Sequence, residues 1–114
     1  MLVYISGPYR AATPGLVRAN VGAAADTAVE LMRMGHAVIC PHTMTWTMEL
    51  YELPDEVFLR TDLDIICRCD ALCLVAGVDW RASHGTMIEV AKARELGIPV
   101  YASPASLQQN LPMQ

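Results

Sequence analysis

Four short apolar segments recur along the chain, and stretches with helical periodicity separate them. Each segment is rich in β-branched or small apolar residues and ends at a glycine, a proline or a serine-proline pair. Short runs that are apolar on both sides are typical of parallel strands that helices cover on two faces. The pattern therefore predicts strands at 2–6, 37–40, 71–76 and 99–102.

The stretch between the first two strands predicts a long amphipathic helix. Thr13 can cap its N-terminus, and Pro14 then occupies the first helical position, where the missing N–H costs nothing. Gly35 is placed to end the helix before the second strand. The apolar residues follow at steps of four and three and form one stripe, made of Val17, Val21, Ala24, Ala28 and Leu31.

A second helix is predicted from residues 54–55 to about residue 67, and its two aspartates lie on different faces. Asp64 has an arginine four residues to either side, which predicts an exposed row of ion pairs. Asp62 shares its stripe with apolar residues, among them Phe58 and Ile66. A carboxylate among apolar neighbours is costly, so Asp62 is a candidate functional residue with a raised pKa.

A third helix is predicted from Ser83 to Leu96, with Glu89 at the edge of its inner side. The regular alternation of strand and helix predicts one α/β domain over residues 1–114. We expect a small Rossmann-like (flavodoxin-like) three-layer sandwich with a mostly parallel sheet of four or five strands. The segment 44–53, with Trp46 and Tyr51, matches no recognisable pattern, and the polar tail from 103 to 114 is expected to be peripheral.

Composition and charge narrow the classes of function. Hydrophobic residues make up 54% of the chain and charged residues 18%, which excludes a disordered linker. The net charge is −4 and no basic stripe is visible, so a long nucleic acid is not an expected partner. A single phosphate remains possible, because backbone amides can hold it.

The same reading predicts a cytoplasmic protein without a membrane segment, a metal or a cofactor. No apolar run approaches the roughly 18–20 residues of a membrane span, and the N-terminus lacks a basic region before its first strand. The four cysteines have neither zinc-site nor disulfide-scaffold spacing and are expected to be reduced thiols. The three histidines are too scattered to predict a metal site.

Two loops follow predicted strands at the carboxyl edge, where open parallel sheets bind ligands. The first loop contains Gly7, which permits close approach of a ligand, and Arg10, whose guanidinium suits a phosphate or carboxylate. The second loop leads into the third helix, whose first amides can hold an anion about one turn before Glu89. That separation suits the 5′-phosphate and anomeric carbon of one nucleotide. The candidate binding residues are Ser6, Gly7, Pro8, Tyr9, Arg10, Trp80, Ser83, His84, Gly85 and Thr86.

Three blocks of the sequence resemble the nucleoside 2-deoxyribosyltransferase-like superfamily, which includes 2′-deoxynucleoside 5′-monophosphate N-glycosidases. They are Val3-Tyr4-Ile5-Ser6-Gly7-Pro8-Tyr9-Arg10, then Thr61-Asp62-Leu63 with Cys69-Asp70-Ala71, and Ser83 to Glu89. The resemblance covers residues 3–100 and is closest to small phage and bacterial members of unassigned function. The Gly85-to-Glu89 stretch also resembles the G-T-x-x-E of cytokinin-activating phosphoribohydrolases, without the preceding glycine pair of that family.

The resemblance implies a catalytic set of three residues. Glu89 would attack the anomeric carbon and form a glycosyl-enzyme, Tyr4 would orient Glu89, and Asp62 would bind the sugar or protonate the leaving base. Ser83 stands where phosphate-binding hydrolases carry serine and the nucleoside transferases carry aspartate, which favours a (deoxy)nucleoside 5′-monophosphate as substrate. Because Glu89 lies near a helix start, we expect it to be ionised.

Several alternatives remain open from the sequence. The enzyme could transfer the glycosyl group to a second base, or the chain could be a catalytically silent nucleotide sensor. Trp80 could stack on a base or only cap the core. The small residues of the first helix also predict a homodimer or a partner-binding face; they are Ala23, Ala24, Ala25 and Ala28. The resemblance implies that such a dimer completes its sites across the interface.

Overall fold

A computed structural model describes residues 1–114. The elements follow in the order β1 (Leu2–Ser6), α1 (Pro14–Arg33), β2 (Ala37–Ile39), α2 (Pro41–Thr45), η1 (Trp46–Tyr51), α3 (Asp55–Ile66), β3 (Ala71–Leu74), η2 (Trp80–Ala82), α4 (His84–Glu95), β4 (Val100–Tyr101) and α5 (Pro104–Gln108). The short elements η1 and η2 are 3₁₀ helices. The four predicted strands are all present, and three of them are one or two residues shorter than their apolar runs.

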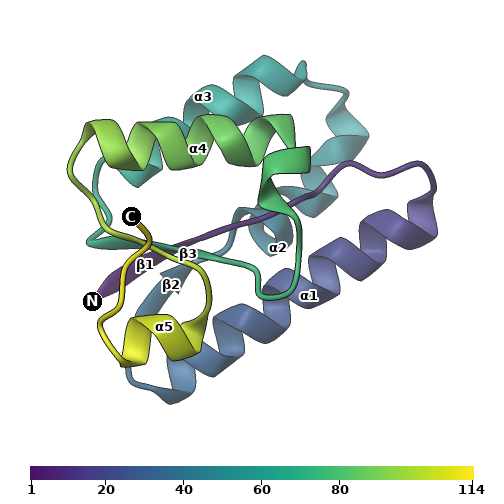
Figure 1. Ribbon diagram of the computed structural model, residues 1–114. Helices are drawn as coiled ribbons and strands as arrows, with labels where there is room; N and C mark the ends of the chain where they lie inside the picture. Colours follow the sequence, from purple (N-terminus) through teal and green to yellow (C-terminus); the bar gives the residue numbers. More distant parts are fainter.

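The sheet is entirely parallel and has the order β2-β1-β3-β4 (Figure 1). In this order the chain leaves β1 toward one side of the sheet and leaves β3 toward the other. The carboxyl ends of β1 and β3 therefore form the point where the strand order reverses, and a crevice opens there in flavodoxin-like folds. The structure confirms the predicted α/β, Rossmann-like architecture and positions the two candidate loops at this point.

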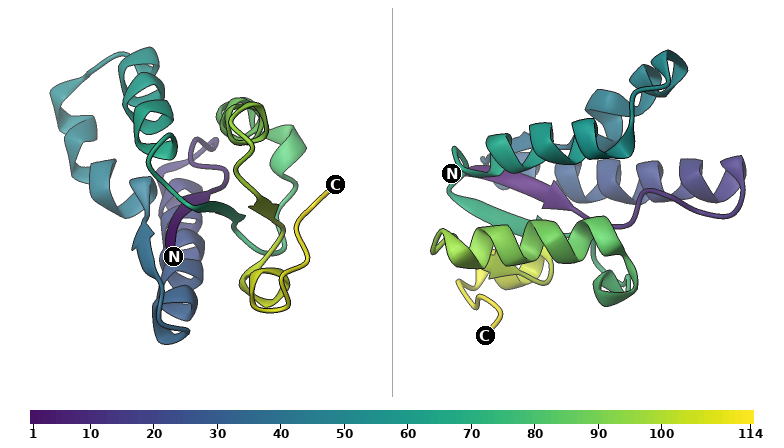
Figure 2. Two further views of the ribbon diagram at one scale, coloured as in Figure 1. Left: turned by 90° about the vertical axis from the view of Figure 1, so that its left-hand side faces the viewer. Right: turned by 90° about the horizontal axis from the view of Figure 1, so that it is seen from above.

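Helices cover both faces of the sheet, which gives three layers (Figure 2). On one face α1 and α5 pack against a core that includes Val3, Ile5 and Leu31. On the other face α3 and α4 pack against a second core, with Ile66 and Val90 fully enclosed. Alternate residues of each strand feed the two cores, because successive side chains of a strand point to opposite faces.

The first helix begins and ends as its sequence predicts. The Thr13 hydroxyl accepts a hydrogen bond from the Leu16 amide at 3.2 Å, and Pro14 is the first helical residue. Gly35 has a φ of 94° after the last turn, a left-handed conformation that glycine adopts without strain. Local sequence signals are therefore sufficient to define α1.

Two sequence predictions are wrong outside the site. The tail is not peripheral throughout, because Leu107 of α5 belongs to the core and Pro104 of the same helix is also buried. The ion-pair row around Asp64 is absent, and Arg68 instead donates to the Asp64 main-chain carbonyl at 2.9 Å. Exposed i,i+4 pairs gain little in water, so a main-chain acceptor competes successfully. All four cysteines are free, and of these only Cys67 is exposed.

Candidate functional site

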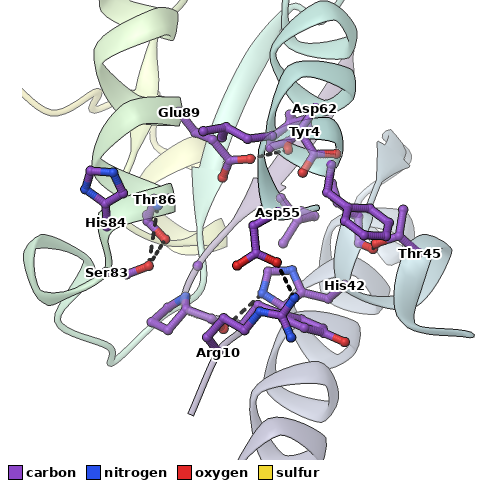
Figure 3. A pocket seen from close by; sticks show the side chains of 18 of the residues that line it. Tyr4, Arg10, His42, Thr45, Asp55, Asp62, Ser83, His84, Thr86 and Glu89 are labelled. Carbon is purple, nitrogen blue, oxygen red and sulfur yellow. Dashed lines mark hydrogen bonds and ion pairs between the residues drawn. The ribbon is translucent and has the colours of Figure 1, made fainter. Parts of the chain in front are cut away.

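A cavity of about 590 Å³ opens at the carboxyl ends of β1 and β3. This volume lies within the range of about 300–1,000 Å³ that is usual for small-molecule sites. Its walls come from the loop after β1, from α2, η1 and the start of α3, and from the start of α4 (Figure 3). Segments that are distant in the sequence thus meet around one cavity, and Tyr4, Asp62 and Glu89 all line it.

Glu89 of α4 is held by two hydroxyl groups from β1. The Tyr4 hydroxyl donates to Oε2 at 2.5 Å, and the Ser6 hydroxyl donates to Oε1 at 2.6 Å. Tyr4 and Ser6 are two residues apart in a strand, so both side chains leave the same face of the sheet. Each carboxylate oxygen of Glu89 accepts one hydrogen bond, and the carboxylate plane is thereby oriented.

The ionisation of Glu89 is set by two opposing effects. The side chain is only 8% exposed, and burial raises the pKa of its carboxyl group, while the hydrogen bonds from Ser6 and Tyr4 lower it. The net direction is upward. The two hydroxyl donors therefore favour the ionised form of Glu89 and offset part of the effect of burial.

Asp62 of α3 also lines the cavity and lies close to Tyr4 (Figure 3). Burial, and then the neighbouring charge of Glu89, raise the pKa of Asp62 to about 7, while the nearby Tyr4 hydroxyl lowers it in part. Oδ1 is buried and has no partner within the chain. The raised pKa that the apolar stripe predicts is thus present, and its second cause is Glu89.

The start of α4 has the predicted cap. The Ser83 hydroxyl accepts from the Thr86 amide at 3.4 Å and from the Thr86 hydroxyl at 2.8 Å. Ser83, His84, Gly85 and Thr86 all line the cavity, as does the exposed Asp79 just before them. The first turn of α4, a helix of 12 residues, therefore borders the cavity, and the positive end of its dipole lies there.

Arg10 is already engaged in the loop after β1. Its guanidinium contacts Glu49 at 3.1 Å and Asp55 at 2.5 Å, and it lies 5.4 Å from the centre of the Tyr9 ring. The carbonyl oxygen of Pro8 forms a hydrogen bond with Nε2 of His42, at a distance of 3.0 Å. The Arg10 guanidinium, which was predicted to bind an anion, thus lines the cavity, but it is already paired with two carboxylates.

Gly7 allows this loop to pass close to β3. A Cβ at this position would lie 2.6 Å from Cγ2 and 2.9 Å from Cβ of Val75, closer than packed carbon atoms can approach. Pro8, Tyr9 and Arg10, which follow this close contact, line the cavity. A side chain at position 7 must displace either the loop or Val75.

We expect Gly7→Ala to lower the free energy of unfolding by about 1–3 kcal/mol, because it overpacks the contact with Val75. Urea denaturation measures this change. Gly22→Ala is the matched control, since its Cβ would meet nothing within 4 Å and its position is inside α1. The control should stabilise the protein by about 0.5–1 kcal/mol, because alanine favours a helix interior. Equal effects of both substitutions would contradict the close contact.

Two predicted binding residues do not line the cavity. Ser6 is fully buried and binds Glu89 instead. Trp80 is partly buried against the second core, with the guanidinium of Arg81 4.4 Å and that of Arg94 5.9 Å from its ring centre. These contacts favour the second of the two predicted roles of Trp80, in which the ring covers the core. The ring packs against apolar side chains and under two guanidinium groups, so it makes favourable contacts without a ligand.

One wall of the cavity, formed by α2, η1 and the start of α3, was not predicted from the sequence. His42 follows β2 directly, so it stands at the same carboxyl edge as the two predicted loops, and this position could have indicated it. No comparable position in the sequence indicated the acidic residues Glu49, Asp55 and Glu56. The missed lining residues are Pro41, His42, Thr45, Glu49, Asp55, Glu56, Phe58 and Leu59. No group of three or more histidine, cysteine or acidic side chains is arranged to hold a metal ion.

Comparison with known proteins agrees with this architecture. A family model described as a domain of unknown function, DUF4406, matches residues 1–102. The fold is similar to that of 2-deoxyribosyltransferase from the psychrotolerant bacterium Bacillus psychrosaccharolyticus, with a TM-score of 0.60 and 19% sequence identity over 88% of this chain and 69% of that chain. No curated protein gives a significant sequence match. The similarity confirms a nucleoside 2-deoxyribosyltransferase-like fold. No helix has both the length and the apolar character to cross a membrane.

Proposed function

The chain belongs to the DUF4406 family, and we propose that it cleaves the N-glycosidic bond of a (deoxy)nucleoside 5′-monophosphate to a free base and a sugar 5-phosphate. One observation carries this proposal. A buried carboxylate, Glu89, is oriented by Tyr4 and Ser6 in a cavity that also holds Asp62, a carboxyl group with a pKa of about 7. A nucleophile and an acid with different environments are the groups that glycosidic cleavage requires.

The two carboxyl groups divide the reaction between them. An oxygen of Glu89 attacks the anomeric carbon while the bond from that carbon to the base nitrogen breaks. Asp62, protonated below about pH 7, donates its proton to the leaving base. Water then attacks the anomeric carbon, the ester bond from that carbon to Glu89 breaks and frees the Glu89 carboxylate, and the ionised Asp62 accepts a proton of the water. Two displacements at one carbon retain its configuration.

The 5′-phosphate would bind at the start of α4. The helix dipole and the first amides favour an anion there, and Ser83 and Thr86 contribute hydroxyl groups beside the cavity. The presence of serine at position 83, as in the phosphate-binding hydrolases, supports this placement. We also include Arg10 among the binding residues, because it lines the cavity, where Glu49 and Asp55 hold its guanidinium.

Base exchange is the second candidate, because the chain shares its fold with a 2-deoxyribosyltransferase. In that reaction the nitrogen of a second base, in place of water, attacks the glycosyl-enzyme. A catalytically silent nucleotide sensor would use the same cavity without turnover.

We also propose that the protein is located in the cytoplasm.

A homodimer is part of the proposal. Exposed apolar side chains on α1, among them Val29 and Met32, border a shallow apolar groove that continues over β2 to Met44 of α2. A second copy covering this groove would remove that surface from water. Sedimentation velocity measures the state directly, and a monomer at micromolar concentration would contradict this part.

Release of free base from a panel of ribo- and deoxyribonucleoside 5′-monophosphates, followed by chromatography, tests the function. We expect one or a few monophosphates to yield base, and the matching nucleosides without phosphate to react more slowly. Adding a second free base separates the two reactions: a new nucleotide product identifies base exchange, and its absence identifies hydrolysis. Binding of a monophosphate without any turnover identifies the sensor. Absence of both binding and turnover would contradict the proposal.

A further inference from the structure

The end of the cavity formed by η1 and the start of α3 is rich in hydrogen-bond acceptors. Glu49 of η1 and Asp55 and Glu56 at the start of α3 line it, and Arg10 is the only lysine or arginine in the cavity wall. Because Arg10 is held between Glu49 and Asp55, this group of three side chains keeps a net negative charge. In Figure 3, Ser83 and His84 lie on one side of Glu89, while Asp62 and Thr45 lie on the other.

His42 adds a second, independent acceptor to this end. Its side chain is buried, with 5% of the residue exposed, and it lines the cavity. The Pro8 carbonyl can only accept, so the Nε2 atom 3.0 Å from it carries the hydrogen. Burial lowers the pKa of His42, so the ring is neutral and Nδ1 is an acceptor. That atom is buried and has no partner within the chain. A buried polar group without a partner is costly and is a feature of binding sites.

Arg10 indicates which chemistry this end accommodates. Its guanidinium is a planar cation that lies 5.4 Å from the centre of the Tyr9 ring and contacts two carboxylates. The Tyr9 ring also meets the His42 ring edge-on, with 5.8 Å between the ring centres. An aromatic face with acidic neighbours attracts flat cations and repels anions.

We infer that the base of the substrate is a planar cation, such as a pyridinium or an N-alkylated purinium ring, bound at the end of the cavity formed by Tyr9, His42, Glu49, Asp55 and Glu56. The inference rests on the proposed function, because it assigns the sugar to Glu89 and the phosphate to the start of α4. The cavity then has one pole for each charge of the substrate. The anionic phosphate meets the positive end of a helix, and the cationic ring meets carboxylates and a neutral histidine.

A cationic base also changes what the reaction requires. When Glu89 attacks the anomeric carbon, the electrons of the broken bond pass to the ring nitrogen and cancel its positive charge. The base leaves neutral, and no proton is transferred to it. Cleavage of a cationic base therefore does not need the proton of Asp62, whereas cleavage of a neutral base does.

Binding to the Glu89→Gln variant tests the inference without turnover. The probes are nicotinamide mononucleotide, whose ring is a pyridinium cation, and its reduced form, whose dihydropyridine ring is uncharged but similar in size. Isothermal titration at pH 7.5 and low salt should give a Kd about tenfold lower for the cation, since two or three carboxylates face it. The ratio should shrink at 0.5 M salt, because salt screens exposed charges. Equal or weaker binding of the cation would overturn the inference.

A pair of charge variants, each made in the Glu89→Gln background, identifies the carboxylates responsible. Glu49→Gln with Asp55→Asn removes two carboxylates and releases Arg10, so the preference for the cation should disappear. Asp64→Asn with Glu95→Gln changes the net charge equally at exposed positions outside the cavity and should leave the preference unchanged. Loss of preference in both double variants would overturn the assignment to this end.

Turnover separates this inference from the proposed function. A preference for the cation without cleavage of any substrate supports the inference and contradicts the glycosidase. Cleavage of neutral monophosphates without a preference for the cation supports the glycosidase and overturns the inference. In single-turnover assays that follow only the first release of base, Asp62→Asn should slow this step far less with a cationic substrate than with neutral bases, and an equal slowing with both would overturn the inference.

Discussion

Glu89→Gln is expected to lower the rate of base release by a factor on the order of 10³–10⁶, the range seen when an enzyme loses its nucleophile. The amide nearly preserves the shape of the side chain and can still accept from one of the two hydroxyl donors, Tyr4 or Ser6. It cannot supply the electron pair that forms the glycosyl ester. Single-turnover assays with the substrate identified by the panel measure the effect.

Mass spectrometry gives a second reading of the same prediction. Acid-quenched wild-type protein should carry the mass of the sugar phosphate on the peptide that contains Glu89, and the variant should not. Glu95→Gln is the matched control, because it lies on the same helix, is exposed, and pairs only with Lys92 at 3.9 Å. A Glu89→Gln variant that retains more than about a tenth of the wild-type rate would exclude Glu89 as the nucleophile.

Asp62→Asn is expected to slow the cleavage of neutral bases by about 10²–10⁴, the usual contribution of a general acid. In the wild type, kcat/KM should fall as pH rises above about 7, because Asp62 then loses its proton. It should also fall at low pH, where Glu89 becomes protonated, and burial places that limb above the ordinary pKa of a glutamate. The variant should lose the limb near pH 7. Persistence of that limb in the variant would exclude Asp62 as the acid.

The same substitution should raise stability at alkaline pH. The pKa of Asp62 is about 7 in the folded protein, whereas the ordinary value for an aspartate, which applies to the unfolded chain, is 3.8. Between these two pH values the folded protein therefore binds more protons than the unfolded chain. Its contribution to stability is complete below about pH 4 and is lost as pH rises through 7. The amide introduced by Asp62→Asn has no charge to bury, so thermal unfolding should show a larger gain in Tm at pH 8 than at pH 5. An equal gain at both pH values would contradict the raised pKa.

The elements of the fold were largely predictable because their signals are local. Thr13, Pro14 and Gly35 mark the ends of α1 by the chemistry of single residues, and the apolar stripe between them needs only helical spacing. The segment from 41 to 51 gave no such pattern, and its two short helices were missed. The tail was misjudged because two buried residues, Pro104 and Leu107, are too few to form a periodic signal.

The sequence by itself determined the strands, the long helices, and the placement of Ser83 and Glu89 on one helix, because these follow from spacing and from the backbone preferences of nearby residues. It also identified Asp62 as a carboxyl group on an apolar face. Only the tertiary structure decided the partners. Ser6 became a hydrogen-bond donor to Glu89 across 83 positions, and Arg10 was neutralised by carboxylates 39 and 45 positions away. Burial, charge and hydrogen bonding depend on which segments meet in space, and periodicity indicates only which way a side chain faces.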